Sequence, residues 1–211
     1  MRRSYGTLSV VVFAFVACGC SQMDASDEIP TVNKSLSTLV PEYTEISKVR
    51  LPNGRRYVAL GETEDKAFSV FPKTSRAFLL LDDTIPGLPL DFKSKGWESS
   101  SEGFGIILHD DKIVLAMRQY ESIEPDEFAS ILENVKSVNG LDHFQSVTQD
   151  KAEYWFVKFG HDEIVLSRVP GPKKKYQVTV TIGNERIIDT LGILKDVKKE
   201  DLQPPTENHA R

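Results

Sequence analysis

Two short polar stretches, near positions 109 and 161, place an imidazole beside carboxylates. Imidazole nitrogens and carboxylate oxygens are ligands of divalent cations. Asp and Gly are also common in hairpin turns, and only two further histidines are available to complete a zinc site. We therefore expect two turns, with no metal and no other cofactor. The alternative is a metal site made of His109, Asp110, His161 and Asp162.

Two other polar runs have a less specific chemistry. The serines 99–101 lack the Gly-x-Ser-x-Gly pattern that exposes a catalytic nucleophile. The basic run Gly171 to Lys175 could touch anionic headgroups or form a solvated hairpin tip. A net charge of −5 argues against nucleic acid as a partner. We expect a protein that is not an enzyme.

Aromatic residues form the main candidate contact surface. Alternation along a strand sends Trp155 to one face of a sheet and its neighbours Tyr154 and Phe156 to the other. Trp97 lies with Phe92 in a stretch, 82–102, that we expect to be irregular. That stretch is either an aromatic contact loop or an insertion whose aromatics fold back on the core. The predicted partner-binding aromatics are Trp97, Tyr154, Trp155 and Phe156.

The first nineteen residues have the pattern of an export signal. Arg2 and Arg3 precede an apolar run from Leu8 to Ala17. A membrane-spanning helix needs about 20 apolar residues, so this ten-residue run indicates a cleavable signal.

The sequence Ala17-Cys18-Gly19-Cys20 resembles the lipobox of bacterial lipoproteins, although that family most often has Leu where Ala17 stands. The resemblance implies acylation, palmitate included, at Cys20, with Cys18 as an alternative. It further implies a cell-envelope location, at the periplasmic face of the outer membrane if the host has two membranes. The same bond also fits the small-x-small rule of ordinary signals, which would give a soluble secreted or periplasmic protein.

The remaining chain divides by composition. Residues 20–42 are polar and contain Pro30 and Pro41, which predicts a tether between the membrane and a folded domain. Residues 43–195 are expected to fold, with halves at 43–120 and 121–195, and residues 196–211 to form a mobile tail. Because the chain's two cysteines are Cys18 and Cys20, we expect no disulfide in the folded part.

The periodicity of the folded part predicts an α+β protein. Asn53-Gly54 suits a tight hairpin turn. The run 125–139 has the apolar spacing of a helix and begins with Pro125, while shorter helices are expected after Thr63 and after Asn184. Alternating strands then predict antiparallel sheet, with two or three short helices on one face.

A faint internal repeat suggests a duplicated unit of one helix and several strands. The Ile-Val-Leu runs that begin at Ile113 and Ile164 are 51 residues apart, and each follows a turn that contains His and Asp. The helices around 65–71 and 126–132 also correspond.

The run from Tyr57 to Thr63, with a short helix ending at Val70-Phe71-Pro72, resembles the unit of BamE/SmpA-type lipoproteins. It is also similar to tandem-unit β-lactamase-inhibitor proteins. Such proteins bind other proteins and are not enzymes, but no binding residue carries over. Two departures are expected, an insertion of about 20 residues before the second hairpin and an extra strand in the second unit.

These observations lead to one main functional hypothesis, a lipid-anchored, non-enzymatic envelope protein that binds or scaffolds another protein. One alternative is a carrier of a small apolar ligand, with the loop around Phe92 and Trp97 as its lid. The other is an exported hydrolase without a recognisable motif.

Overall fold

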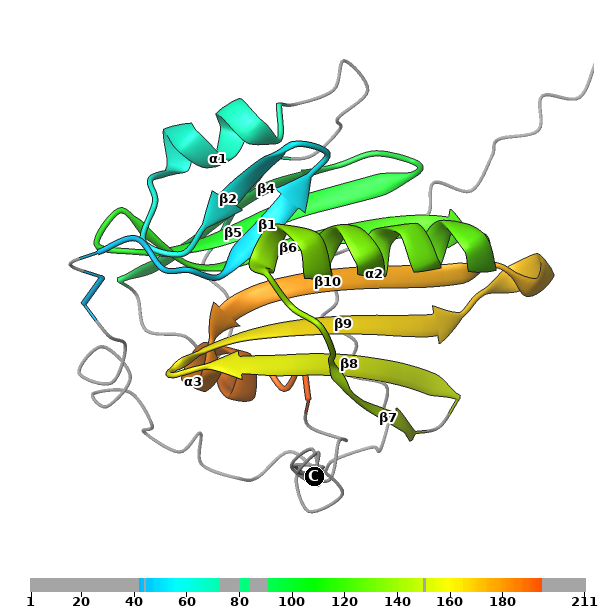
Figure 1. The fold of residues 1–211 in the computed structure, drawn as a ribbon. Helices are drawn as coiled ribbons and strands as arrows, with labels where there is room; N and C mark the ends of the chain where they lie inside the picture. The colour runs from blue at the N-terminus through cyan, green and yellow to red at the C-terminus, as the bar shows by residue number, and fades with distance from the viewer. Residues whose placement is uncertain (1–41, 44, 73–79, 84–90, 150, 195–211) are drawn as a thin grey trace, which may run out of the picture. The chain divides into compact units, whose positions relative to one another are not determined.

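The computed structural model describes residues 42–43, 45–72, 80–83, 91–149 and 151–194, all within one compact unit, 32–211 (Figure 1). The predicted signal peptide, both cysteines, nearly all of the predicted tether and the predicted tail at 196–211 lie outside the described residues.

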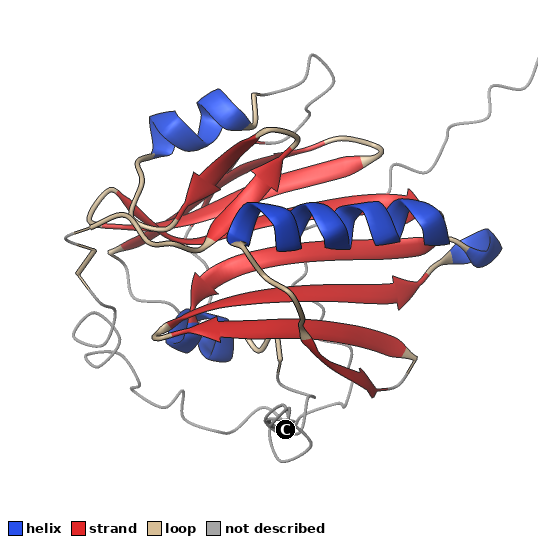
Figure 2. Ribbon diagram, viewed as in Figure 1, coloured by secondary structure: helices blue, strands red, loops and turns tan. Residues whose placement is uncertain are grey.

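Eight strands form one antiparallel sheet, and two more form a separate hairpin, which confirms the predicted α+β class (Figure 2). The order across the sheet is β3-β4-β5-β6-β10-β9-β8-β7. Its strands are β3 (Leu80–Asp83), β4 (Phe92–Glu98), β5 (Glu102–His109), β6 (Lys112–Ile123), β7 (Gln145–Gln149), β8 (Ala152–Phe159), β9 (Asp162–Pro170) and β10 (Tyr176–Asn184). The hairpin is β1 (Arg50–Asn53) and β2 (Arg56–Ala59), and Gly54 makes its turn with φ 61°.

The α-helices are α1 (Glu64–Val70), α2 (Pro125–Asn139) and α3 (Glu185–Thr190). The long helix α2 begins with a capping box, in which Glu124 accepts from the first turn and its own N–H donates to Glu127 Oε2 at 2.8 Å. It ends at Gly140, whose φ of 64° is the left-handed conformation of a helix end. Within the described residues, no helix is long and apolar enough to cross a membrane.

Each face of the sheet has its own apolar core. One core includes Val135 of α2, Ala67 of α1 and Leu51 of β1, so two helices and the hairpin cover this face. The other core includes Ile187 and Ile188 of α3. Two helices therefore share one face, within the expected two or three, and α3 covers the other. The short turn after β10, capped by Asn184 Oδ1 accepting from Arg186 N at 3.1 Å, carries α3 to the opposite side.

A bulge in β6 changes the predicted alternation of its side chains. The pairing with β5 shifts between Ile107 and Leu108, so both Val114 and Leu115 face the α3 side while Ile113 faces α1 and α2. The start of β6 also pairs with residues before α1, through Ile113 N donating to Glu62 O at 2.9 Å. This second pairing lies beside the bulge.

The same order of elements occurs twice, as a helix followed by four antiparallel strands. The first series runs from α1 to β6 and the second from α2 to β10, and the two helices begin 61 positions apart. The last strand of each series, β6 and β10, pair at the centre of the sheet.

This repeat corrects two expectations. The 51-residue spacing matches β6 to β9, whereas the order of elements matches β6 to β10. The expected irregular insertion at 82–102 contains β4, so neither series has an extra strand.

Candidate functional site

The two polar turns are built into the ends of the β5–β6 and β8–β9 hairpins. His109 Nε2 lies 3.2 Å from Asp91 Oδ2, and the ring packs on Phe92 with centroids 4.6 Å apart. The carbonyl of His161 accepts from Glu185 N at 2.8 Å, which joins the second turn to α3. Among the residues that the structure describes, no three His, Cys, Asp or Glu side chains gather as potential metal ligands. The structure places His109 and Asp110 at the β5–β6 turn and His161 and Asp162 at the β8–β9 turn.

Asp162 fixes the segment that enters the domain. Its two carboxylate oxygens accept from Tyr43 Oη at 2.7 Å and from Ser47 Oγ at 2.6 Å. Burial, followed by the nearby Asp162 carboxylate, raises the pKa of the Tyr43 hydroxyl above its ordinary value. Tyr43 therefore remains a hydrogen-bond donor at physiological pH, and this pair acts as a structural tie.

Two of the predicted contact aromatics are core residues. Trp97 is 3% exposed, and its indole N–H donates to Phe71 O at 3.0 Å. Phe156 is 2% exposed on the α3 side of β8. The prediction that these two side chains contact a partner is therefore wrong. Phe92, the other half of the predicted lid, is 1% exposed in β4.

Trp155 and Tyr154 are half-buried and project to opposite faces of β8, as the alternation predicted. Trp155 shares the α2 side with Val157 and Phe159, and the loop after α2 adds Leu141 and Phe144 to the same cluster. We call these five half-buried residues the β8 shelf. In Figure 1 the loop after α2 runs across β9 and β8 toward β7, while α2 itself lies nearer the centre of the sheet.

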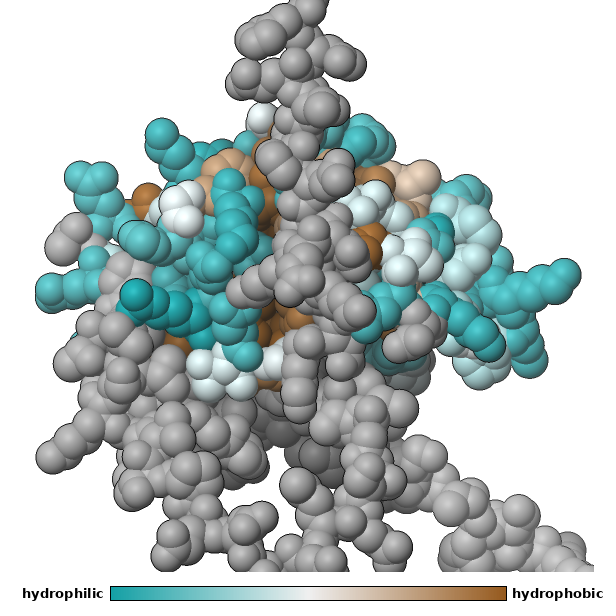
Figure 3. Space-filling model, turned by 90° about the horizontal axis from the view of Figure 1, so that it is seen from below, coloured by the Kyte–Doolittle hydropathy of each residue, from teal (hydrophilic) through white to brown (hydrophobic). Residues whose placement is uncertain are grey.

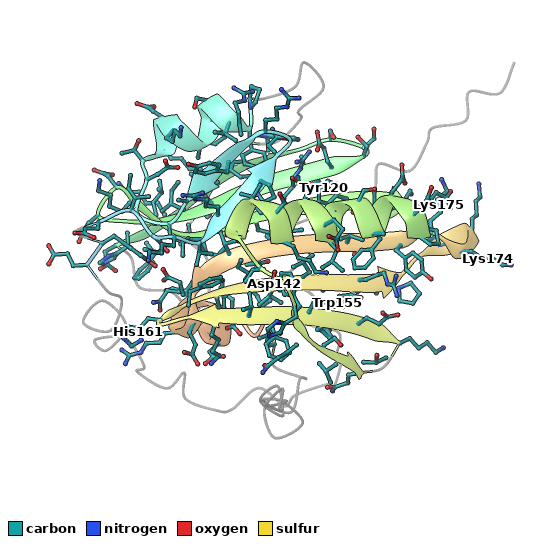
Figure 4. All side chains as sticks on the ribbon, in the orientation of Figure 1. Tyr120, Asp142, Trp155, His161, Lys174 and Lys175 are labelled. Carbon is teal, nitrogen blue, oxygen red and sulfur yellow. The ribbon has the colours of Figure 1, made fainter. Side chains whose placement is uncertain are left out.

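Trp155, labelled on β8 in Figure 4, has an aromatic ring on one side and a guanidinium on another. The ring of Phe128 from α2 lies 4.8 Å away between centroids. The Arg168 guanidinium lies 5.3 Å from the Trp155 ring and 4.8 Å from that of Tyr176. Arg168 Nη2 also donates to Glu153 Oε2 at 2.5 Å. A rigid, partly exposed aromatic of this kind can contribute contact area at little entropic cost.

The shelf adjoins an edge strand that has no charged residue. Strand β7 pairs with β8 on one side, and no described strand pairs with its other side. Its residues are Gln145, Ser146, Val147, Thr148 and Gln149. Natural edge strands commonly have a charge or a proline that prevents pairing with another chain, and β7 has neither. The opposite edge strand, β3, ends in two aspartates.

Figure 3 views the molecule from below, the side on which β7 and β8 lie in Figure 1. Among the described residues on this side, apolar residues show between hydrophilic ones. Sequence reasoning identified Trp155 but missed the rest of the shelf. Its signal was present, because Trp155, Val157 and Phe159 are spaced by two. The edge position of β7 depends on long-range pairing and had no local signal.

Comparison with known proteins adds little. No family model matches the chain, and no curated protein matches it. A solved structure of a cysteine-rich secretory protein (SAV1118) from Staphylococcus aureus subsp. aureus Mu50 matches with 13% identity and a TM-score of 0.31. The match covers 61% of this chain and 46% of that one, so the chain spans less than half of that protein's length. A similarity at this level carries no argument about fold or function.

Proposed function

We propose that this chain is a lipid-anchored, non-enzymatic protein of the cell envelope that binds another protein along β7 and the β8 shelf. The partner would contribute an extended, uncharged segment with apolar side chains. The observation that carries the proposal is an uncharged edge strand beside half-buried aromatics. The lipobox-like sequence Ala17 to Cys20 supports the anchor.

The chemistry of strand addition explains the choice of partner. An edge strand offers main-chain N–H and C=O groups to an incoming strand, and neighbouring side chains then select its apolar residues. A charged partner segment would lose hydration at the shelf without gaining an ion pair from β7. The carrier alternative is not proposed, because its expected lid residues Phe92 and Trp97 are part of the core.

Affinity capture with the intact chain tests the binding site. Ser146 and Thr148 are exposed on β7, so the double variant Ser146→Lys/Thr148→Lys adds two charges to the edge without disturbing the core. The control Ala129→Lys/Ser137→Lys adds the same charge on exposed positions of α2. We expect the wild-type chain to recover one specific envelope protein, and the purified pair to bind at least about tenfold more weakly with the edge variant alone.

Equal binding by the wild type and both variants would contradict the β7 site. Failure to recover any envelope protein, together with measurable turnover of an envelope substrate, would overturn the binding function itself.

The anchor is tested separately by the intact mass of the mature chain. Acylated Cys20, or acylated Cys18, supports lipidation. A mature N-terminus with an unmodified cysteine, or one at another position, contradicts it while leaving the β7 site in place.

A further inference from the structure

The hairpin that joins β9 and β10 ends in an exposed basic tip, residues 169–175. The lysines 173–175 stand at its end, and Val169, Pro170 and Pro172 are exposed beside them. Val169 is one of two large hydrophobic side chains that are exposed among the described residues, with 39% of its surface accessible. Lys174 and Lys175 project from this end of the sheet in Figure 4, and His161 lies at the other end.

The lysines of the tip differ in their electrostatic environment. Lys175 Nζ lies 3.0 Å from Glu124 Oε1, at the start of α2. Lys173 and Lys174 make no ion pair with any residue that the structure describes. The nearby carboxylates Glu121 and Glu153 accept hydrogen bonds from other partners, Gln177 and Arg168. Two of the three charges are therefore available to an external anion.

The backbone of the tip is left-handed at two consecutive lysines. Lys173 and Lys174 have φ of 58° and 62°, a left-handed conformation that is unfavourable for side chains other than Gly and Asn. Two hydrogen bonds hold it, from Gly171 N to Lys175 O at 2.8 Å and from Lys175 N to Pro172 O at 3.2 Å. Tight hairpin turns commonly have two such residues in a row, and Asp110 and Asp111 have the same conformation in the β5–β6 turn. Here the strain presents two lysines where glycine or asparagine would be more stable.

We propose that this tip contacts the anionic headgroups of a phospholipid surface. Basic side chains flanked by exposed apolar ones suit that surface, because the lysines meet headgroup charge while the apolar side chains enter the interface. The proposal uses the β9–β10 hairpin and not the shelf, so it is independent of the protein-binding function.

The proposed membrane anchor and the tip can reach one surface. Tyr43 binds Asp162 at the start of β9, and the tip lies at the other end of that nine-residue strand, about 30 Å away. The 22 residues between Cys20 and Tyr43 can span at most about 75 Å. The chain length between anchor and domain therefore permits the tip to face the membrane that holds the lipid.

Vesicle binding of the mature chain from residue 20, with Cys20 replaced by serine in every sample, tests the proposal. The double variant Lys173→Asn/Lys174→Asn removes two charges and introduces a residue type that accepts left-handed φ. The control Lys48→Asn/Lys66→Asn removes two exposed lysines elsewhere. Vesicles of phosphatidylcholine alone, or with about a third phosphatidylglycerol, supply the surface, and circular dichroism checks that each variant is folded.

We expect the tip variant to reduce partitioning onto the anionic vesicles by about tenfold at low salt, and the control to change it little. The difference should disappear in about 0.5 M salt. Equal partitioning of parent and tip variant, an equal loss in the control, or no preference for phosphatidylglycerol would overturn the proposal. If the tip variant bound vesicles as its parent does but no longer captured an acidic protein that the parent captures, the tip would be a protein-binding site instead.

Discussion

The two series of a helix and four strands use a tryptophan in opposite ways. Trp97 of β4 is buried under Phe71 and Phe104, and its indole N–H is hydrogen-bonded. Trp155 of β8 is half-buried, with Phe128 and Arg168 on its flanks. The strands occupy equivalent places in the sheet, one strand from each edge.

The difference lies in what covers each half. The first half is covered by α1 and by the β1–β2 hairpin, whose residues Leu51 and Val58 are fully buried. The second half has no hairpin of its own before α2. One arrangement of elements therefore makes a closed core in the first series and leaves an apolar shelf in the second.

The largest expected effect is on the buried tryptophan. Trp97→Ala should lower the free energy of unfolding by about 3–5 kcal/mol, because it leaves a cavity and removes the hydrogen bond to Phe71 O. Trp155→Ala should lower the free energy of unfolding by less than half of that amount. Urea unfolding of both variants measures the difference. Equal losses would mean that Trp155 belongs to a closed core and that the shelf is not a surface.

Each series also has an arginine that stacks on aromatic rings, Arg118 in the first and Arg168 in the second. As with the tryptophans, the one in the first series makes more contacts. Arg118 binds Glu102 Oε2 at 2.8 Å and Asn53 Oδ1 of the hairpin at 3.0 Å, whereas Arg168 binds Glu153. Arg118→Met should lower the free energy of unfolding by about 2 kcal/mol and Arg168→Met by about 1 kcal/mol, because the first loses an additional contact to the hairpin. Urea unfolding again provides the measurement. A larger loss for Arg168→Met would show that the hairpin adds nothing to the first half.

Local patterns predicted the elements well, because capping and periodicity act within a few residues. Pro125 and Gly140 do bound α2, and Asn184 does cap α3. The stretch 82–102 was misjudged because Pro86, Pro89 and three serines obscured the strand at 92–98. The face on which Leu115 lies depends on a bulge in β6, next to the pairing of that strand with residues before α1.

The candidate site was only partly predictable for the same reason. Trp155 and its side of the strand follow from alternation, but burial of Trp97 requires Phe71 and Phe104 to meet it from elsewhere in the chain. The aspartate of the second turn was expected to be a turn residue, yet nothing local predicts its bonds to Tyr43 and Ser47 across more than a hundred positions.

Asn139 connects the hairpin to α2 and should have an intermediate effect. Its side chain accepts from Arg50 N at 2.8 Å and donates to Arg50 O at 2.9 Å. Asn139→Ala should lower the free energy of unfolding by about 1.5 kcal/mol, because it leaves two main-chain groups of β1 without that partner. In this variant, amide hydrogen exchange should quicken more in β1 and β2 than in the paired strands β8 and β9. Uniform quickening would show that the hairpin does not form a separate cover.

The smallest expected effect depends on pH and lies in β4. Partial burial, followed by the nearby Glu121 carboxylate, raises the pKa of the Glu98 carboxyl. A raised carboxyl pKa favours the protonated folded state, so its contribution is complete below the ordinary pKa near 4.5 and is lost as pH rises through the raised value. Glu98→Gln should therefore stabilise the protein at pH 7, by no more than about 0.5 kcal/mol after solvent screening, and have no effect near pH 3.5. Unfolding midpoints of wild type and Glu98→Gln at both pH values measure this effect. Glu45→Gln, at an exposed position, is the control. A loss of stability at pH 7 would show that the charged form of Glu98 is favoured in the folded state.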